Sequence, residues 1–551
     1  MTCRPRRSLR NWGRRVLYLS ALALLVWVGE RAASLADPFP IDLLERFPES
    51  RQVTGRDGTL LRLVPTTDGE RRVRLPLHDF SPHVVRAVLA AEDHRFGNHS
   101  GVDFLAVVRA GFTSVMRGRI VSGASTLHMQ LSRIVEPHAR TIGGKLHEMR
   151  RARQLARVLD AEAVLEAYLN LVPMGGTLRG FPVASLRWFG KSARDLAPQE
   201  AATLAAMLPA PSRRRPDRAT SELRLARDRI LDAMRDCDDL DTASWHRAKS
   251  APLVARAHPW PWHAPHFADL ALRTDDRTRI TTSIEPEFQR TLHELVQRER
   301  PAGVDGVCIV VLERTSQEVV ALVGSRSWRE SQVNAAMARR SAGSTLKPFI
   351  YALALEAGAI GFDALVADTP VTFRDYAPAN FDKTWSGPVR VSDALVRSRN
   401  APAVRILRVV GVSRFRDLLR SIGLDSGDRA LHLDAALGTV AVTPLALARA
   451  YCRFADLDER IPHVSASVRA RVLEVLRQTS PDVATCPEGV VAWKTGTSSG
   501  RRDAWCVGVT DRHVIVTWLG NLRGRGSADL VGARSAGKLL ASAASFLDRI
   551  L

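Results

Sequence analysis

The chain has 551 residues, of which 25% are charged and 45% are hydrophobic. This length allows two or three domains with full cores, and the composition is that of a globular protein rather than a disordered chain or a protein with many membrane spans. The formal net charge of +21 favours an acidic partner such as nucleic acid, a phosphate-bearing substrate or an anionic membrane surface.

The N-terminal residues predict a membrane anchor. An arginine-rich stretch at residues 1–15 precedes an uncharged, mostly apolar run at residues 16–29. We therefore expect a cytoplasmic basic tail over 1–15 and a transmembrane signal-anchor over 16–36, with the rest of the chain exported. The alternative is a cleaved signal peptide, for which residues 34–36 form a passable cleavage site. Export argues against nucleic acid as the partner.

The hydrophobic pattern and composition change along the part of the chain that we expect to be exported. Residues 82–235 show helical periodicity, whereas the segment at 258–265 is rich in Pro, Trp and His and does not suit a continuous helix. Beyond it, strand-like runs near 307–323 and 504–518 alternate with apolar helical segments. We therefore predict a connecting segment over 37–75, a mostly α domain over 76–235, a linker over 236–280 and an α/β domain over 281–551.

The helical region carries two carboxylates with catalytic potential. Glu92 lies on the apolar face that Val85, Val88 and Leu89 form at helical spacing. A carboxylate on such a face loses hydration, which raises its pKa and suits it to exchange a proton near neutral pH. The second carboxylate, Glu148, follows Lys145 by three residues on a later helix.

The sequence predicts an anion site between these carboxylates. Residues 123–130 form a stretch of glycine and hydroxyl side chains that leads into a helix, where exposed backbone N–H groups favour an anion. Arg133, Arg140 and Lys145 supply cations nearby in the sequence, as a pyrophosphate requires. Each feature alone is common in ordinary helices and caps, so the prediction depends on their order together.

These motifs in this order resemble glycosyltransferase family 51, the peptidoglycan-polymerising domain with a lysozyme-like α fold. The resemblance covers about residues 80–216 and includes a closing helix at 200–212. The matching motifs are Glu92-Asp-x-x-Phe-x-x-His-x-Gly101, Gly123-x-Ser-Thr-x-x-x-Gln130, Lys145-x-x-Glu148, and Tyr168-Leu-Asn170 followed by Gly175.

The resemblance implies a role for each matched residue. Glu92 would deprotonate the acceptor sugar hydroxyl of lipid II, with inversion at the donor anomeric centre. Glu148, Arg133 and Lys145 would attend the departing lipid pyrophosphate, alone or with a divalent cation, Mg²⁺ or Mn²⁺. The remaining matched positions are expected to bind substrate: Asp93, His99, Ser125, Thr126, Gln130 and Arg140.

Two positions depart from the family pattern. Gly144 stands where an arginine often precedes the lysine, which removes one expected cation. His128 occupies a place usually filled by a small hydroxyl residue, so we expect altered packing of this loop.

A further apolar face lies between the first two motifs, flanked by arginines. A core helix is the default interpretation, and insertion into a bilayer surface is the alternative. The face comprises Phe104, Leu105, Val108, Phe112, Val115 and Met116, with Arg109, Arg117 and Arg119 alongside.

The predicted α/β domain contains a candidate nucleophile, Ser344, and a lysine amine three residues later, at Lys347. Pro348 is tolerated only near a helix start, so Ser344 falls in the first turn of an apolar helix and Lys347 lies on the same face. A serine hydroxyl needs a base within hydrogen-bonding reach, and a lysine serves if burial or nearby cations make its neutral amine accessible. The chain otherwise prefers arginine, which does not lose its proton.

Three motifs in order resemble the penicillin-recognising serine acyltransferases. They are Ser344-Thr-Leu-Lys347, Ser398-Arg-Asn400 and Lys494-Thr-Gly-Thr497. The resemblance implies that Ser344 forms an acyl-enzyme with the penultimate D-Ala of a stem peptide, with Lys347 as its base and no cofactor. It also implies that Ser398 relays the proton to the leaving D-Ala.

The same resemblance implies the substrate contacts of this second site. Asn400 would hold the substrate amide. The terminal carboxylate would bind to Lys494, Thr495 and Thr497, around Gly496. The backbone N–H groups of Ser344 and Thr497 would form the oxyanion hole.

Both halves together resemble the class A penicillin-binding proteins, which are bifunctional peptidoglycan synthases. The implied fold is an N-terminal transmembrane helix, a mostly α lysozyme-like glycosyltransferase domain and an α/β transpeptidase domain of the β-lactamase-like type. A subgroup of the family commonly carries a further C-terminal β domain, whereas this sequence stops at Leu551. We expect that module's function to be absent or supplied by a partner.

The family resemblance implies a location and partners. We expect a single-pass protein of the bacterial inner membrane, with its N-terminus in the cytoplasm and its catalytic domains in the periplasm. The expected partners are lipid II, nascent peptidoglycan, the bilayer, β-lactam inhibitors and other cell-wall synthesis proteins. Two alternatives stay open: the second domain is a peptide-sensing scaffold beside a working glycosyltransferase, or it is a DD-carboxypeptidase or β-lactamase-like hydrolase.

Overall fold

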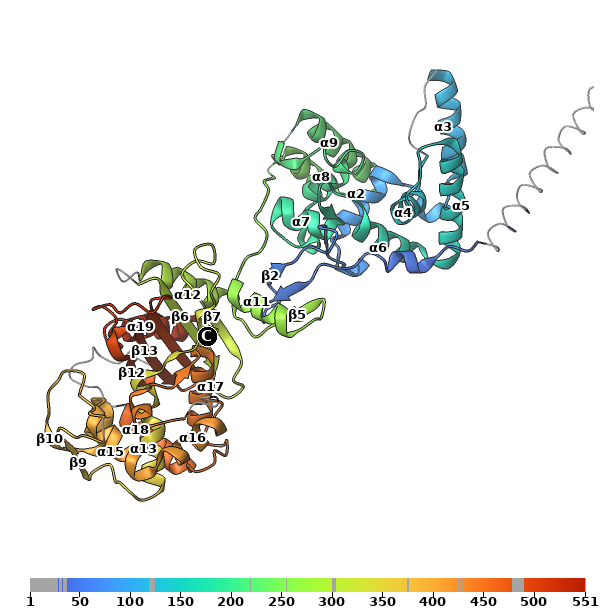
Figure 1. The fold of residues 1–551 in the computed structure, drawn as a ribbon. Helices are drawn as coiled ribbons and strands as arrows, with labels where there is room; N and C mark the ends of the chain where they lie inside the picture. Colours follow the sequence, from blue (N-terminus) through green and yellow to red (C-terminus); the bar gives the residue numbers. More distant parts are fainter. Residues whose placement is uncertain are drawn as a thin grey trace, which may run out of the picture. The chain divides into compact units, whose positions relative to one another are not determined.

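The computed structural model describes residues 37–117, 124–218, 220–253, 255–299, 304–373, 376–424, 430–477 and 490–550, together with Val28, Ala32 and Gly427. The chain divides into two compact units. Unit 1 comprises Met1–Arg51 and Leu63–Trp260, and unit 2 comprises Gln52–Arg62 and Pro261–Leu551 (Figure 1).

The predicted membrane anchor over 16–36 lies outside the described residues, apart from Val28 and Ala32. Among the helices that the structure does describe, none has both the length and the apolar character needed to cross a bilayer.

Unit 1 consists mainly of helices, which confirms the predicted mostly α first domain (Figure 1). In the described residues of this unit, one short parallel pair of strands is formed, β3 (Arg71–Arg72) with β4 (Leu178–Arg179), and an isolated bridge joins Pro173 and Arg179. The helices are α2 (Pro82–Glu92), α3 (Phe104–Arg117), α4 (Leu127–Val135), α5 (Ile142–Val158), α6 (Ala161–Leu171), α7 (Phe181–Phe189), α8 (Pro198–Met207), α9 (Ser221–Asp236) and α10 (Thr242–Ser250).

Side-chain caps fix where the helices that carry the predicted glycosyltransferase residues begin. Ser81 accepts a hydrogen bond from the His83 N–H at the start of α2, and Thr126 accepts one from the Met129 N–H at the start of α4. Thr141 caps α5 in the same way. Because such caps satisfy N–H groups that a helix leaves unpaired, they set the register of the side chains that follow.

Unit 2 is built on a five-stranded antiparallel sheet in the order β12-β13-β14-β6-β7, which confirms the predicted sheet-containing second domain. The strands are β6 (Gly306–Glu313), β7 (Val319–Val323), β12 (Val490–Thr497), β13 (Asp503–Thr510) and β14 (His513–Gly520). Alternate residues of β6 face different cores, with Val310 in one and Ile309 in the other. This explains why β6 is a nearly continuous apolar run.

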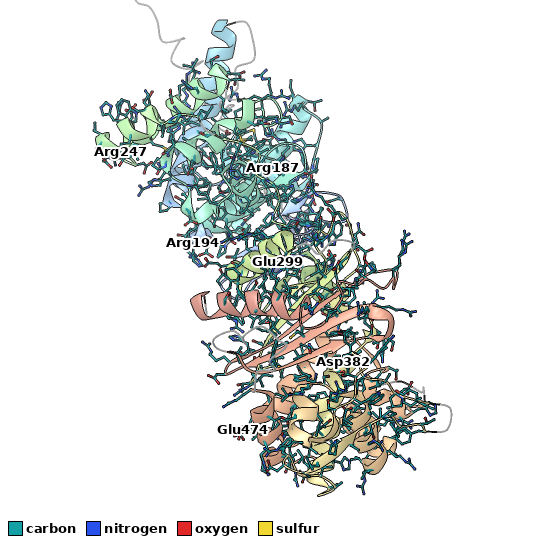
Figure 2. All side chains as sticks on the ribbon, turned by 90° about the vertical axis from the view of Figure 1, so that its left-hand side faces the viewer. Arg187, Arg194, Arg247, Glu299, Asp382 and Glu474 are labelled. Atoms are coloured by element: carbon teal, nitrogen blue, oxygen red, sulfur yellow. The ribbon has the colours of Figure 1, made fainter. Side chains whose placement is uncertain are left out.

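Helices cover both faces of this sheet. One core contains residues of α12 (Pro286–Arg298) and α19 (Ala536–Ile550). Glu299, which directly follows α12 and is labelled in Figure 2, forms an ion pair of 3.1 Å with Lys538 on α19. The other core contains residues of α13 (Lys347–Glu356) and α17 (Pro444–Ala455).

The second site lies where α13 begins beside the sheet. The single turn η7 (Gly343–Leu346) leads directly into α13 and contacts β12. The remaining helices pack around α13, and the hairpin β9 (Leu365–Asp368) with β10 (Gly387–Arg390) lies beside them. These helices are α14 (Val391–Val396), α15 (Asn400–Val410), α16 (Val412–Ser421) and α18 (Ala466–Leu476).

The division between the units differs from the predicted segments. The predicted linker over 236–280 contains α10, α11 (Pro265–Thr274) and β5 (Arg279–Thr281), and the division falls within it, after Trp260. The prolines do not prevent helix formation here, because Pro265 occupies the first turn of α11, where its missing N–H costs nothing.

Part of the predicted connecting segment over 37–75 belongs to unit 2. The strand β1 (Gln52–Thr54) pairs in parallel with β5 and also borders β2 (Leu60–Leu63). Arg62 forms an ion pair of 2.5 Å with Asp269 and lies 3.2 Å from the ring centre of Trp262. Residues 52–62 are therefore held by contacts with a part of the sequence about 200 positions away.

Candidate active sites

Glu92 is the last residue of α2 and is half-buried. The Nε2 of Gln130 on α4 donates to Glu92 Oε2 at 2.7 Å, and the Tyr168 hydroxyl donates to Gln130 Oε1 at 3.0 Å. The tyrosine thus fixes the orientation of the amide that faces the carboxyl. Burial raises the pKa of Glu92, against the opposing effects of Gln130 and of the Arg133 charge. The result is a desolvated carboxyl that suits general-base chemistry.

Three of the predicted substrate-binding residues make contacts within the protein, and their contact with substrate stays a prediction. Asp93 Oδ2 accepts from the Leu127 N–H at 3.0 Å, and His99 Nε2 lies 3.1 Å from both oxygens of Asp93. The Thr126 hydroxyl donates to the Gly101 carbonyl at 2.6 Å. These bonds tie the loop after Glu92 to the start of α4, so they position Glu92 and Gln130 relative to one another.

His128, one of the two departures from the family pattern, belongs to this support. Its ring lies 5.2 Å from Phe96 and 5.7 Å from His99, between ring centres. Burial lowers the pKa of His128 to about 4, so the ring stays neutral and packs as an aromatic side chain. The expected change in loop packing is therefore an aromatic cluster beneath the loop.

Glu148 forms the second polar cluster and is only 3% exposed. Lys145 Nζ donates to Glu148 Oε1 at 2.9 Å and to Ser125 Oγ at 2.6 Å. Arg133 lies 3.9 Å from Glu148 Oε2. Arg140 is exposed, and we find no polar partner for it within the described residues. The predicted anion site thus contains Ser125, Arg133, Lys145 and Glu148, with Arg140 outside the cluster.

Helix α4 links the two carboxyls. Gln130 and Arg133 are three residues apart and so lie on one face of the helix. Gln130 contacts Glu92, and Arg133 faces Glu148 while its charge also acts on Glu92. A proton acceptor and a cationic cluster are therefore held by the same rigid element.

The cluster does not suit a metal ion held by the protein alone. Its carboxylate, Glu148, already has Lys145 and Arg133 within 4.0 Å, and these cations oppose a divalent ion. Across the described ranges, no group of three His, Cys, Asp or Glu side chains is arranged to hold a metal. The expectation of Mg²⁺ or Mn²⁺ therefore stays a prediction that depends on phosphate oxygens of a substrate as further ligands.

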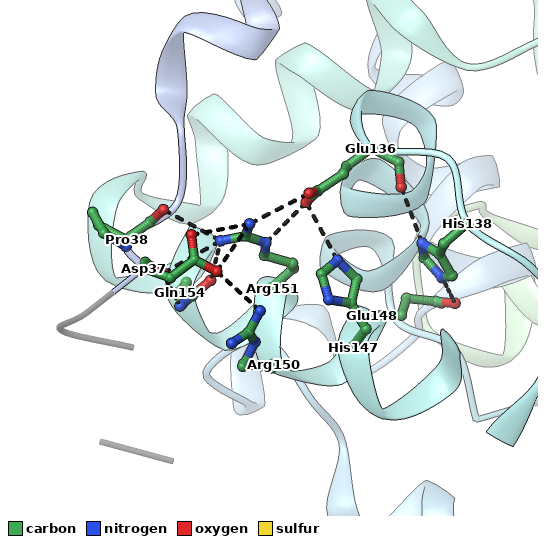
Figure 3. A network of polar contacts seen from close by, with 9 residues as sticks. All are labelled: Asp37, Pro38, Glu136, His138, His147, Glu148, Arg150, Arg151 and Gln154. Atoms are coloured by element: carbon green, nitrogen blue, oxygen red, sulfur yellow. Dashed lines mark hydrogen bonds and ion pairs between the residues drawn. The ribbon is translucent and has the colours of Figure 1, made fainter. Parts of the chain in front are cut away.

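Sequence reasoning missed two residues near these carboxyls. The charge of Arg214 favours the ionised form of Glu92, and His138 lies 3.6 Å from Glu148 (Figure 3). The arginine run at 213–215, directly after the closing helix, was an available signal for the first. His138 belongs to no motif, so only the fold brings it to the site.

The second site is centred on Lys347, which begins α13 and is fully buried. Its Nζ donates to the backbone oxygens of Ser398 at 2.6 Å and Arg399 at 3.1 Å, and to Asn400 Oδ1 at 2.7 Å. Burial, together with the positive charges of Lys494 and Arg399, lowers the pKa of Lys347 well below its ordinary value. A neutral amine is therefore accessible at this position, as base catalysis requires.

The predicted contact between Ser344 and Lys347 is not a hydrogen bond in this structure. Ser344 is half-buried in η7, and among the described residues no hydrogen bond joins its hydroxyl to the Lys347 amine. A neutral amine has two N–H groups for the three acceptors that surround Lys347, so deprotonation leaves its lone pair available to another donor. Catalytic hydrogen bonds commonly tighten only when substrate is bound.

Ser398 is joined to the other lysine. Lys494 Nζ donates to Ser398 Oγ at 2.8 Å and to the Thr495 carbonyl at 2.9 Å. Burial lowers the pKa of Lys494 to about 7. Lys494 thus binds the hydroxyl of Ser398 and Lys347 binds its backbone oxygen, so Ser398 contacts both lysines, as suits a proton relay.

The turn that carries Ser398 is braced by a buried ion pair. Ser398 has a φ of 60°, a left-handed conformation that costs free energy in a non-glycine residue. Arg399 Nε donates to Asp368 at 2.6 Å, and its NH1 donates to Asp382 at 2.8 Å. Asn380 Oδ1 accepts from the Asn400 N–H at 2.7 Å. These contacts hold the Ser398–Asn400 turn against Lys347.

Close backbone contacts bring Ser344 and Thr497 together. A Cβ on Gly496 would lie 2.8 Å from the Ala342 carbonyl, and one on Gly343 would lie 2.9 Å from the Thr497 nitrogen. Gly438, with a φ of 74°, packs so closely on Gly343 that any side chain would overlap its backbone. The glycines therefore let the ends of η7 and β12 approach as an oxyanion hole requires.

Thr497 has a structural partner as well. Its Oγ1 accepts a hydrogen bond from the Gly532 N–H at 3.0 Å. The hydroxyl proton remains available to a substrate carboxylate next to Lys494 and Thr495.

Sequence comparisons match both halves to known families. Residues 57–235 match the family described as Transglycosylase, and residues 307–511 match the Penicillin binding protein transpeptidase domain. The chain is 35% identical over 547 residues to penicillin-binding protein 1C of Escherichia coli (strain K12), which covers 95% of this chain and 71% of the relative. It is 28% identical to penicillin-binding protein 1B of Vibrio cholerae, over 84% of this chain and 67% of the relative.

Solved structures support the same fold. The crystal structure of penicillin-binding protein 1A from Haemophilus influenzae aligns with a TM-score of 0.55 at 17% sequence identity. The alignment covers 92% of this chain and 93% of that chain.

We predict that Gly438→Ala disrupts the second site. Its Cβ would overlap Gly343 and force η7 away from Thr497. The matched control is Gly423→Ala, because Gly423 also has a positive φ of 82° but nothing lies within 4 Å of its Cβ position. The control should lose about 1–2 kcal/mol from backbone strain alone and keep labelling by a fluorescent penicillin. Equal labelling of both variants would contradict the proposed close contact.

We also predict a bell-shaped pH dependence for penicillin acylation. The rate should fall above about pH 7, because Lys494 then loses the proton that attracts a carboxylate, and should fall at low pH as Lys347 is protonated. In Lys494→Arg the charge persists, so the alkaline decline should move to higher pH. The exposed Lys538→Arg serves as the control and should keep the original profile. An unchanged alkaline decline in Lys494→Arg would rule out this assignment.

Proposed function

Because this chain belongs to the class A penicillin-binding proteins, we propose that Glu92 and Ser344 are the catalytic centres of its two activities. The chain is a peptidoglycan synthase, with a glycosyltransferase domain that polymerises glycan strands and a transpeptidase domain that cross-links stem peptides.

In the first reaction, Glu92 removes the proton from the acceptor sugar hydroxyl of lipid II. The resulting oxygen attacks the anomeric carbon of the donor, and the bond from that carbon to the lipid pyrophosphate breaks with inversion. The departing negative charge develops beside Lys145 and Arg133. Glu148 orients these two cations, since it contacts both of them.

In the second reaction, Lys347 accepts the proton of Ser344 as the hydroxyl oxygen attacks the penultimate D-Ala carbonyl. The N–H groups of Ser344 and Thr497 stabilise the oxyanion, and Ser398 passes the proton to the nitrogen of the leaving D-Ala. An amine of a second stem peptide then attacks the acyl-enzyme and releases Ser344. In its charged form, Lys494 holds the terminal carboxylate.

One observation carries this proposal more than any other: Lys347 has no exposed surface and is held by three oxygens of the turn that contains Ser398. Burying a lysine costs free energy, and a purely structural role would be served by an apolar side chain. The position therefore favours an acyl-transfer catalyst over a peptide-sensing scaffold. Transfer to an amine and hydrolysis by water would use the same groups, so the acceptor has to be measured.

We further propose that unit 1 docks on the bilayer surface, as suits a lipid-linked substrate. The side chains of Phe104, Leu105 and Val108 on α3 are 55%, 64% and 70% exposed, so for these three residues the core interpretation is wrong. Ile142 and Leu146 on α5 are also exposed. The side chains of residues 111–117, including Phe112, Val115 and Met116, lie outside the described set. Exposed apolar residues gathered on two helices are typical of interfacial binding.

The proposed location is the bacterial inner membrane, with a single N-terminal anchor and both catalytic units in the periplasm. Family members bind lipid II, nascent peptidoglycan and β-lactams. Contacts with other cell-wall synthesis proteins remain a proposal.

The two chemistries should separate by mutation. Glu92→Gln should abolish glycan formation from lipid II while Ser344 is still labelled by a fluorescent penicillin, because the two sites belong to different units. Ser344→Ala should polymerise lipid II but yield no cross-linked muropeptides. Chain elongation by Glu92→Gln would rule out Glu92 as the base. Release of D-Ala by the wild-type chain without cross-links would indicate a carboxypeptidase.

Bilayer docking should depend on the exposed face of α3. In a chain that starts at Asp37, Leu105→Asp should lower co-sedimentation with phosphatidylglycerol vesicles several-fold, because an aspartate resists burial among acyl chains. Leu225→Asp on α9 is the matched control, since Leu225 is similarly exposed at 58%. Equal losses, or no loss, in the two variants would contradict the docking face.

A further inference from the structure

His138 faces the carboxylate oxygen of Glu148 that Lys145 does not contact. Its Nε2 lies 3.6 Å from Glu148 Oε2 (Figure 3). Lys145 contacts Oε1 at 2.9 Å. The histidine side chain is 16% exposed, and Glu148 is buried. Neither the family motifs nor the mechanism above assigns this histidine a role.

The second ring nitrogen of His138 fixes how the ring meets Glu148. Its Nδ1 lies 3.0 Å from the backbone carbonyl of Glu136, and a carbonyl only accepts hydrogen bonds. Nδ1 therefore carries a proton. The Nε2 that faces the carboxylate attracts it only when it too carries a proton, since two lone pairs would otherwise oppose each other. The geometry therefore assigns Nδ1 to the Glu136 carbonyl and leaves Nε2 as the nitrogen that faces Glu148.

The carbonyl that holds His138 is itself braced. The Glu136 carboxylate accepts from Arg151 Nε at 2.8 Å and lies 3.4 Å from His147 Nε2 (Figure 3). The same arginine donates to Gln154 Oε1 at 3.0 Å and to the Pro38 carbonyl at 3.2 Å. A network from residue 38 to α5 therefore fixes the position of the backbone against which His138 is held.

The space occupied by the His138 ring exists because residue 144 is a glycine. A Cβ on Gly144 would lie 3.0 Å from His138 Cδ2 and would overlap the Ala139 carbonyl. Any side chain at this position would displace the ring or the backbone that follows it. The glycine at position 144 is therefore what allows the His138 ring to lie beside Glu148.

We propose that His138 is a positioning residue for Glu148 in glycosyl transfer, an inference that rests on the proposed role of Glu148. Its ring lies beside one carboxylate oxygen while Lys145 donates to the other, which limits how the Glu148 carboxylate can turn and so keeps Lys145 and Arg133 directed at the departing diphosphate.

Two substitutions test the contacts of the two ring nitrogens separately. In His138→Asn, the amide nitrogen replaces Nδ1 and keeps the bond to the Glu136 carbonyl but does not reach Glu148. In His138→Gln, the longer amide replaces Nε2 and reaches Glu148. With the full-length chain and lipid II in vesicles, we expect Asn to lower kcat of glycan formation about 10–100-fold with little change in KM. Gln should stay within a few-fold of wild type.

Controls distinguish this inference from the function on which it rests. His78→Asn, whose side chain is 82% exposed, should polymerise as wild type does. Glu148→Gln should lower glycan formation to a small but measurable residual rate, and full activity of that variant would refute the proposed role of Glu148 itself. In the Glu148→Gln background, adding His138→Asn should cause no further loss. Penicillin labelling of Ser344 should be normal in every variant.

Three results would overturn the positioning role while leaving the role of Glu148 intact. The first is wild-type kcat in His138→Asn. The second is an equal loss in the Asn and Gln variants, which would mean that the ring only fills space. The third is a loss that multiplies with that of Glu148→Gln, which would mean that the two residues act independently.

Discussion

The removal of one lysine amine from water is the constraint on which the transpeptidase site depends. Lys347 is fully buried, so water does not stabilise its charged form. The positive charges of Lys494 and Arg399 destabilise that form further, and the pKa of Lys347 is lowered. Three oxygens of the Ser398–Asn400 turn compensate in part and fix the direction of the amine. The buried pair of Arg399 with Asp368 exists to hold that turn in a conformation that serine rarely adopts.

In the glycosyltransferase site, burial likewise shifts the pKa of the catalytic group, which here is a carboxyl. Glu92 is desolvated at the end of α2, and α4 presents Gln130 to it and Arg133 to Glu148. The bonds that Asp93 and Thr126 make within the protein fix the start of α4. In both units, therefore, residues that accompany the catalytic group in a motif serve to fix the backbone around it.

The sequence predicted the parts of each site that depend on local spacing. Ser344 and Lys347 lie one helical turn apart, and Pro348 marks where that helix starts. The raised pKa of Glu92 was predicted from its place on the apolar face of α2. The sequence did not predict contacts between distant segments, such as Lys494 with Ser398 or His138 with Glu148, because periodicity carries no information about which elements meet. The same limit explains the predicted linker, since the pairing of β1 with β5 joins segments more than 200 residues apart.

That strand pairing also determines how the protein can be divided. Unit 2 is not a continuous stretch of sequence, because Gln52–Arg62 supplies two of the three strands in the sheet that contains β5. A fragment that begins at Pro261 would leave the edge of β5 unpaired and would uncover apolar contacts that Val53 and Leu61 now make. Open strand edges of this kind promote aggregation. An isolated, soluble penicillin-binding fragment would therefore have to carry these eleven residues, supplied by fusion or as a separate peptide.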